Sequence, residues 1–138
     1  MKKISVIALF ALASLVSVGS VSAQDHTLQA TVPFDFTVDR TLLPSGTYTI
    51  KPTSANSVVI LNREKNISVI SSVYTDDKES LTGKLVFNKY GDQYFLHKIL
   101  SSSIDVNLAI PISKIEKRAA RSQVAWLHGG EQVLVALE

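Results

Sequence analysis

The chain contains no cysteine and only three histidines among its 138 residues. Without thiols it can form no disulfide, no iron–sulfur cluster and no thiolate zinc site, and it has no cysteine nucleophile. The histidines, His26, His97 and His128, are too far apart in sequence for a His-x-His or His-x-x-x-His metal motif. We therefore expect no metal site and no cofactor, and a fold that is stabilised by packing and strand pairing.

The familiar arrangements of catalytic residues are missing as well. Serines are plentiful, but none lies in the Gly-x-Ser-x-Gly turn that exposes a nucleophile in α/β-hydrolases. Asp35 and Asp39 would lie about 13 Å apart along an extended strand, too far to act as one catalytic pair. We therefore expect no catalytic residues and a protein that is not an enzyme. The enzymatic alternative is a hydrolase with an unrecognised site around Asp92 and His97.

The first 23 residues have the features of a secretory signal peptide. Residues 1–3 form a basic start, residues 4–18 are almost all apolar or small, and residues 21–23 offer a small-residue cleavage site. The apolar run is shorter than the ~20 residues that span a membrane, with an uncleaved anchor helix as the alternative. We predict cleavage after Ala23, a periplasmic or extracellular location, and no transmembrane segment in the mature chain.

The mature chain is balanced in charge. Removing Lys2 and Lys3 with the signal takes the basic residues from 14 to 12, equal to the 12 acidic ones. A nucleic-acid surface needs an excess of basic side chains, because phosphate contacts supply most of the affinity. Residues 24–138 therefore predict a single secreted domain with no nucleic-acid partner.

The mature sequence is a succession of short strand patterns separated by turns. Val32, Phe34, Phe36 and Val38 occupy alternate positions, as on a strand with one buried face. A turn is expected at residues 43–46, where proline comes early and glycine late. Further strands are expected at 47–51, 57–61, 67–74, 84–88, 93–100, 104–110 and 133–137. This pattern predicts an all-β fold, either an antiparallel sandwich or a small barrel, of about seven to nine short strands.

One short helix is expected near the C-terminus. Ser113 and Glu116 have the spacing of a capping box, and residues 117–123 are rich in helix-forming side chains. Four cations would share one face of this helix: Lys114, Lys117, Arg118 and Arg121. We interpret that face as solvated rather than as a site for an anionic lipid or polymer, because Glu116 interrupts it. The pattern leaves helix extension and a strand both open for residues 124–128.

Two motifs resemble a known pattern. Residues 32–49 read VPFDFTVDRTLLPSGTYT, and residues 85–96 read LVFNKYGDQYFL. Together they resemble an uncharacterised family of small secreted bacterial proteins of acidobacterial type, with a VPFDFTV…LP-G-Y-T start and a LVF--YGDQYFL hairpin. The resemblance implies a secreted protein and brings no catalytic residues with it. Residues 101–110 depart from it, because they are more strand-like than the Gly-rich link expected there.

The densest group of recognition-type side chains lies at and beyond the turn of the expected 84–100 hairpin. The binding candidates are Tyr90, Asp92, Tyr94 and His97. Stacking and hydrogen bonding by these residues would suit a sugar or a peptide, although the simpler interpretation is that Gly91 and Asp92 form the turn. Strict alternation would place His97 on the same strand face as Phe95 and Ile99.

These features favour a non-enzymatic β-domain that binds or supports a component of the cell envelope. The partner would be an envelope protein, a polysaccharide or an apolar ligand, the last held inside a small barrel. An outer-membrane barrel is disfavoured, because its membrane-spanning strands need ~9–11 residues each and most of the strands expected here are shorter. The residues expected in the core are Phe34, Phe36, Tyr48, Phe87, Phe95 and Ile99.

Overall fold

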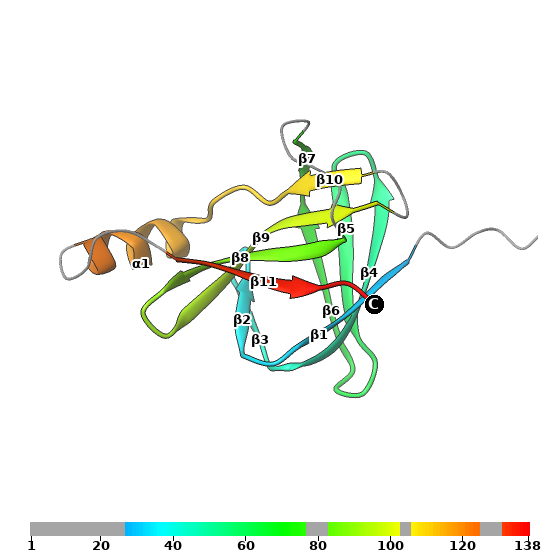
Figure 1. Cartoon of the computed structure of the whole chain (residues 1–138), viewed down its shortest axis with the longest axis horizontal. Coiled ribbons are helices and arrows are strands. Elements are labelled where there is room, and N and C mark those ends of the chain that lie inside the picture. Colours follow the sequence, from blue (N-terminus) through cyan, green and yellow to red (C-terminus); the bar gives the residue numbers. More distant parts are fainter. Residues whose placement is uncertain (1–26, 77–82, 103–105, 125–130) are drawn as a thin grey trace, which may run out of the picture.

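The computed structural model describes residues 27–76, 83–102, 106–124 and 131–138, which contain eleven strands and one helix (Figure 1). The strands are β1 (Leu28–Val32), β2 (Phe36–Val38), β3 (Thr41–Leu43), β4 (Gly46–Ser54), β5 (Ser57–Asn62), β6 (Ile67–Ser72), β7 (Tyr74–Thr75), β8 (Lys84–Tyr90), β9 (Gln93–Ser101), β10 (Val106–Ala109) and β11 (Glu131–Ala136). The helix is α1 (Lys114–Val124). The predicted all-β class is confirmed. The strand number exceeds the expectation because β2, β3 and β7 have only two or three residues each.

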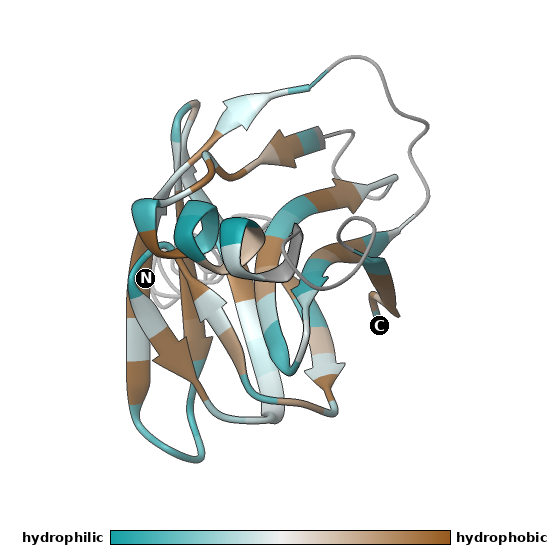
Figure 2. Cartoon of the chain, turned by 90° about the vertical axis from the view of Figure 1, so that its left-hand side faces the viewer, coloured by the Kyte–Doolittle hydropathy of each residue, from teal (hydrophilic) through white to brown (hydrophobic). Residues whose placement is uncertain are grey.

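Two sheets curl towards each other and form a barrel-like wall, seen from two directions in Figure 1 and Figure 2. The first sheet has the order β1-β4-β5-β6, and the second has the order β11-β8-β9-β10-β7. Only Val73 separates β6 from β7, so the chain passes directly from one sheet to the other. On the opposite side, the N–H of Glu138 donates to the carbonyl of Gln29 at 2.8 Å, which joins the end of β11 to β1. The curled arrangement fits the barrel alternative better than a flat sandwich.

The strand expected at residues 32–38 is divided in two. Val32 ends β1 in the first sheet, and Phe36 begins β2, which pairs with β3 and touches β9 of the second sheet. Pro33 lies at the break, where its missing N–H would otherwise interrupt a ladder. The expected burial is nevertheless found: Val32, Phe36 and Val38 are buried, and Phe34 is partly buried against the core.

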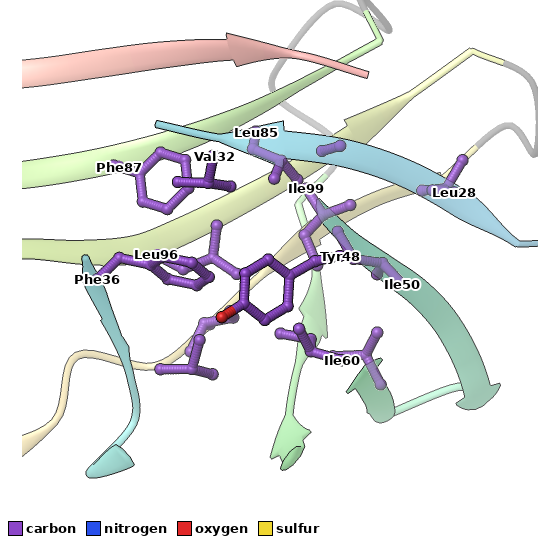
Figure 3. Close-up of a cluster of buried hydrophobic side chains, with 14 of the residues drawn as sticks. Leu28, Val32, Phe36, Tyr48, Ile50, Ile60, Leu85, Phe87, Leu96 and Ile99 are labelled. Atoms are coloured by element: carbon purple, nitrogen blue, oxygen red, sulfur yellow. The ribbon is translucent and has the colours of Figure 1, made fainter. Parts of the chain in front are cut away.

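Aromatic rings fill the centre of the molecule (Figure 3). The ring of Phe36 meets Tyr48 edge-on at a centroid distance of 5.1 Å and Phe87 at 5.3 Å. Such edge-to-face pairs add to the free energy gained from burying the rings. The core prediction is confirmed for the five residues that are buried: Phe36, Tyr48, Phe87, Phe95 and Ile99. Phe34 is the member of the predicted set that stays partly exposed.

The loop between β3 and β4 is fastened by a tyrosine from the strand that follows it. The Tyr48 hydroxyl donates to the carbonyl of Pro44 at 2.5 Å, an arrangement similar to the tyrosine corner of β-sandwich domains. A Cβ at Gly46 would lie 2.9 Å from Nδ2 of the buried Asn62, so the loop needs glycine at that position. Sequence reasoning placed the turn and the inward tyrosine correctly, but it did not connect them.

The β8–β9 hairpin is confirmed, with an irregularity that the sequence pattern did not reveal. The pairing shifts by one residue after Val86, and His97 is the extra residue of a β-bulge. Leu96 and Ile99 therefore both belong to the core, although they lie three positions apart. The expectation that His97 shares one strand face with Phe95 and Ile99 is wrong, because the bulge breaks the two-residue alternation.

Several other expectations concern the later part of the chain. The strand predicted at 104–110 is present as β10, which pairs with β9 and, at two positions, with β7. The helix begins at Lys114 as expected, and Val124 ends it. Residues 125–128 of the undecided segment lie outside the described residues, as do the predicted signal region and most of the charged loop at 75–80.

Candidate functional site

Helix α1 is tied to the second sheet through a buried carboxylate. Ser113 caps the helix: its Oγ accepts from the N–H of Glu116 at 3.2 Å. The Glu116 side chain is only 3% exposed, and its Oε1 accepts hydrogen bonds from Asn88 Nδ2 (2.9 Å) and the Tyr90 hydroxyl (3.3 Å). A carboxylate only accepts hydrogen bonds, so its burial requires donors nearby, and β8 supplies two. The capping-box prediction therefore found the start of the helix, and the structure adds its attachment to β8.

The end of the β8–β9 hairpin lies beside this attachment. Tyr90 pairs with Gln93 across a two-residue turn, in which Gly91 adopts a φ of 63°. The Tyr94 ring stacks on Phe34, with centroids 3.9 Å apart and planes 16° from parallel. The turn interpretation of this segment is thus confirmed, and the aromatic side chains beside the turn pack against neighbouring elements.

Two adjoining hollows flank the hairpin end. The first has a volume of about 500 Å³ and separates the hairpin from α1; it is lined by Tyr90, Asp92, Gln93, Ile115, Arg118, Ala119 and Ser122. The second has a volume of about 440 Å³ and separates the hairpin from β2 and β3; it is lined by Asp35, Thr37, Arg40, Leu42, Asp92, Gln93, Tyr94, Phe95 and Ile115. Both hollows share Asp92, Gln93 and Ile115. We call the two together the hairpin groove.

The hairpin groove combines exposed apolar side chains with charges of both signs. Leu42 is 69% exposed on one side of the groove, and Ile115 is 40% exposed on the other. Arg40 and Arg118 contribute positive charge, and Asp92 contributes negative charge at the hairpin turn. Large apolar side chains exposed around one hollow are unfavourable in water and are common where a protein meets a partner.

The structure brings three of the four predicted binding residues together. Tyr90, Asp92 and Tyr94 line the hairpin groove, whereas His97 lies at the β-bulge further along β9 and lines neither hollow. The Tyr90 hydroxyl donates to Glu116. Phe34 stacks on one face of the Tyr94 ring, and Lys89 Nζ lies over the ring at 5.5 Å from its centroid, so Tyr94 forms part of the groove wall rather than presenting a free aromatic face.

Sequence reasoning missed the other two walls of the groove. The side chains in question are Asp35, Thr37, Arg40, Leu42 and Ile115. Asp35, Thr37, Arg40 and Leu42 reach the hairpin because β2 lies parallel to β9 at a single residue pair, Thr37 with Phe95, whereas Ile115 comes from α1. No local signal predicts such a short parallel contact. On the helix, Ile115, Ala119 and Ser122 recur at intervals of four and three residues, and they line the first hollow together.

Four cations line a further hollow of about 390 Å³ on the helix: Lys114, Lys117, Arg118 and Arg121. All four are exposed. The expectation that Glu116 interrupts this basic face is wrong, because the Glu116 side chain is buried and turned towards β8. The basic face is therefore continuous along the helix.

Two tyrosines have altered acidity. Burial raises the pKa of Tyr90, and the charge of Glu116 and its hydrogen bond raise it further. Burial also raises the pKa of Tyr48; the neighbouring Asn62 amide opposes this effect, and the charge of Asp35 adds to it. Both phenols are therefore neutral hydrogen-bond donors at pH 7.

The described residues contain no cluster of metal-ligating side chains and no helix suited to crossing a bilayer. Across these residues, no three histidine, aspartate or glutamate side chains gather in a way that could hold a metal ion. Over the same residues, no helix combines the length and apolar character needed to cross a bilayer. Comparison of the chain with protein-family models, curated proteins and solved structures finds no match in any of the three.

Proposed function

We propose that this chain is a non-enzymatic binding domain of the periplasm or extracellular space, and that its ligand occupies the hairpin groove. The observation behind this proposal is the convergence of β2–β3, the end of β8–β9 and α1 around two joined hollows with exposed Leu42 and Ile115. The combined volume is within the range of pockets that hold small ligands or peptide segments.

The lining favours a short peptide segment of an envelope protein as the ligand. Leu42 and Ile115 would cover an apolar side chain of the peptide, while Arg40, Arg118 and Asp92 offer partners to charges of either sign. Charged groups around an apolar centre are the usual arrangement of a protein-binding surface.

The other candidate ligands fit this geometry less well. A polysaccharide needs an aromatic face on which a sugar ring can stack, whereas the Tyr94 ring already contacts both the Phe34 ring and the Lys89 ammonium. An apolar ligand inside the wall would have to displace core side chains such as Phe36 and Tyr48, which occupy the interior in Figure 3. For a hydrolase, Asp92 lies in the hairpin turn and His97 lies five residues later in β9, roughly 15 Å away along extended backbone, so they do not meet at one reacting bond.

A peptide-display selection tests the proposal. Random peptides would be selected against the exported protein, and the affinities of enriched peptides would be measured by calorimetry. Leu42→Asp replaces an apolar contact of the groove with a charged, hydrated carboxylate and should weaken binding at least tenfold. Ile70→Asp is the matched control, because Ile70 is equally apolar, 72% exposed and located on β6 rather than at the groove.

The peptide selection has one result that supports the groove as the binding site and others that refute it. Enriched peptides that bind the wild type and Ile70→Asp alike, but bind Leu42→Asp weakly, would support the groove as the site. Failure to enrich any peptide, or equal affinities for both variants, would refute it. Mass spectrometry of the recovered peptides adds a second check, since cleavage of a bound peptide would overturn the non-enzymatic assignment.

A further inference from the structure

The cations of α1 form a single stripe that faces away from the barrel-like wall. Lys114, Lys117, Arg118 and Arg121 occupy relative positions 0, 3, 4 and 7, which at ~100° per residue confines them to an arc of about 100°. Glu116 lies on the other side of the helix, roughly 150° from the middle of that arc, and it is the residue that binds β8. The anchoring side chain thus turns the cationic stripe outward.

The helix stands at one end of the molecule. In Figure 1 it lies beyond the edge of the curled sheets, and Figure 2 looks onto it from outside, with hydrophilic residues across its outer side. Its attachment to β8 through Glu116 keeps it there, with the four cations exposed around the hollow that they line. Because these four cations are spread over residues 114–121, about 10 Å of helix, they match a surface that carries many negative charges.

Exposed isoleucines accompany the stripe. Ile115 lies within about 60° of Arg118 on the helix circumference and is 40% exposed. Ile112, just before the cap residue Ser113, is 45% exposed. A helix with cations on one side and bare apolar side chains next to them is typical of segments that lie at a membrane surface. A soluble polyanion would contact the cations but would leave the isoleucines in water.

We propose that the basic stripe of α1, together with Ile112 and Ile115, docks this protein on a bilayer that contains anionic phospholipids. The cations pair with headgroup phosphates, and the isoleucines enter the boundary between headgroups and acyl chains. The binding is weak and reversible, because only four cations and two apolar side chains take part, and it weakens as salt screens the charges. Ile115 and Arg118 also line the hairpin groove, whereas Ile112, Lys114, Lys117 and Arg121 line neither of its two hollows and therefore carry the test of this inference.

Vesicle sedimentation tests the proposal with protein isolated in its exported form. The vesicles contain phosphatidylcholine alone, or phosphatidylcholine with 30 mol% phosphatidylglycerol. We expect binding to the anionic vesicles in dilute salt, and its loss at high salt. The triple variant Lys114→Gln, Lys117→Gln, Arg121→Gln should lower the partition coefficient at least tenfold. A control variant with the same loss of charge elsewhere, Arg63→Gln, Lys65→Gln, Lys84→Gln, should retain most of the binding.

A second variant distinguishes a membrane from a soluble polyanion. Ile112→Ser lies outside the hairpin groove and should weaken binding to anionic vesicles while leaving binding to soluble polyphosphate unchanged. Equal binding to both kinds of vesicle, or equal losses in the helix variant and its control, would overturn the proposal. It would also be overturned if polyphosphate bound as tightly as the vesicles and Ile112→Ser affected neither, since a soluble polyanion would then be the partner.

Discussion

Tyr48 illustrates how one side chain connects the core to a loop in this fold. Its ring packs edge-on against Phe36 in the interior, and its hydroxyl reaches the carbonyl of Pro44. The ring explains why an aromatic residue is needed there, and the hydroxyl explains why the residue is tyrosine rather than phenylalanine. The loop that it holds leads from β3, one wall of the hairpin groove, into β4.

We expect Tyr48→Phe to lower the free energy of unfolding by about 1–2 kcal/mol, because the Pro44 carbonyl loses its donor while the ring remains. Urea unfolding at pH 7 measures this change. Tyr74→Phe is the matched control; Tyr74 is 51% exposed, and its loss of a hydroxyl should change stability by less than about 0.5 kcal/mol. An unchanged midpoint for Tyr48→Phe would show that the hydrogen bond contributes nothing to stability.

The raised pKa values of Tyr48 and Tyr90 predict a loss of stability in alkaline solution. Each folded-state pKa lies above that of an unfolded tyrosine, about 10, so the unfolded chain releases its protons first as the pH rises. The stabilisation is complete below pH ~10 and is lost as the pH rises from there through the folded-state values. Urea midpoints between pH 8 and pH 11 should fall less steeply for Tyr48→Phe than for the wild type. Identical slopes would contradict the assignment.

At the scale of elements, the sequence pattern predicted those features that depend on interactions between neighbouring residues. The turn at Gly91, the hairpin around it and the cap at Ser113 were predictable, because each depends on a few neighbouring residues. The bulge at His97 and the break after Val32 were not, since both depend on how one strand matches a partner distant in sequence. The orientation of α1 was missed for the same reason: the partners of Glu116 lie 26 and 28 residues earlier.

The attachment of α1 can be tested through Glu116. We expect Glu116→Ala to leave Asn88 Nδ2 and the Tyr90 hydroxyl without their acceptor and to cost about 1.5–3 kcal/mol. Hydrogen exchange should show faster exchange of the α1 amides than in the wild type, with β8 and β9 much less affected. Lys117→Ala, an exposed position on the same helix, is the control and should leave this pattern unchanged. Unaltered exchange in α1 after Glu116→Ala would mean that other contacts hold the helix.

At the scale of the whole molecule, the hairpin groove shows the limit of sequence reasoning. The turn residues Tyr90, Asp92 and Tyr94 were found because they cluster in sequence, and they do line the groove. Leu42 and Ile115, which give it an apolar character, lie about 50 residues before and 20 residues after the turn. Only the folding of β2–β3 and α1 onto opposite sides of one hairpin makes them neighbours.

A second question at the scale of the whole molecule is whether the two sheets unfold as one cooperative unit. The strand β11 covers the core with Val135, and the following Glu138 binds the Gln29 carbonyl and the Thr31 hydroxyl of β1. A charge at Val135 would be forced towards the interior, so we expect Val135→Asp to cost about 2–4 kcal/mol. Leu134→Asp is the matched control, since Leu134 is the neighbouring residue, is 56% exposed and should tolerate the change within about 0.5 kcal/mol.

Hydrogen exchange of the Val135→Asp variant then distinguishes a continuous wall from two independent sheets. If the bonds between Glu138 and β1 couple the sheets, amides of β1 and β4 should lose protection together with those of β8. Urea unfolding followed by circular dichroism and by tyrosine fluorescence should still give one shared midpoint, because a single cooperative unit unfolds as a whole. Faster exchange confined to β8 and β11, with β1, β4 and β5 as protected as in the wild type, would show that the sheets are separate units and that the contact at Gln29 does not close the wall.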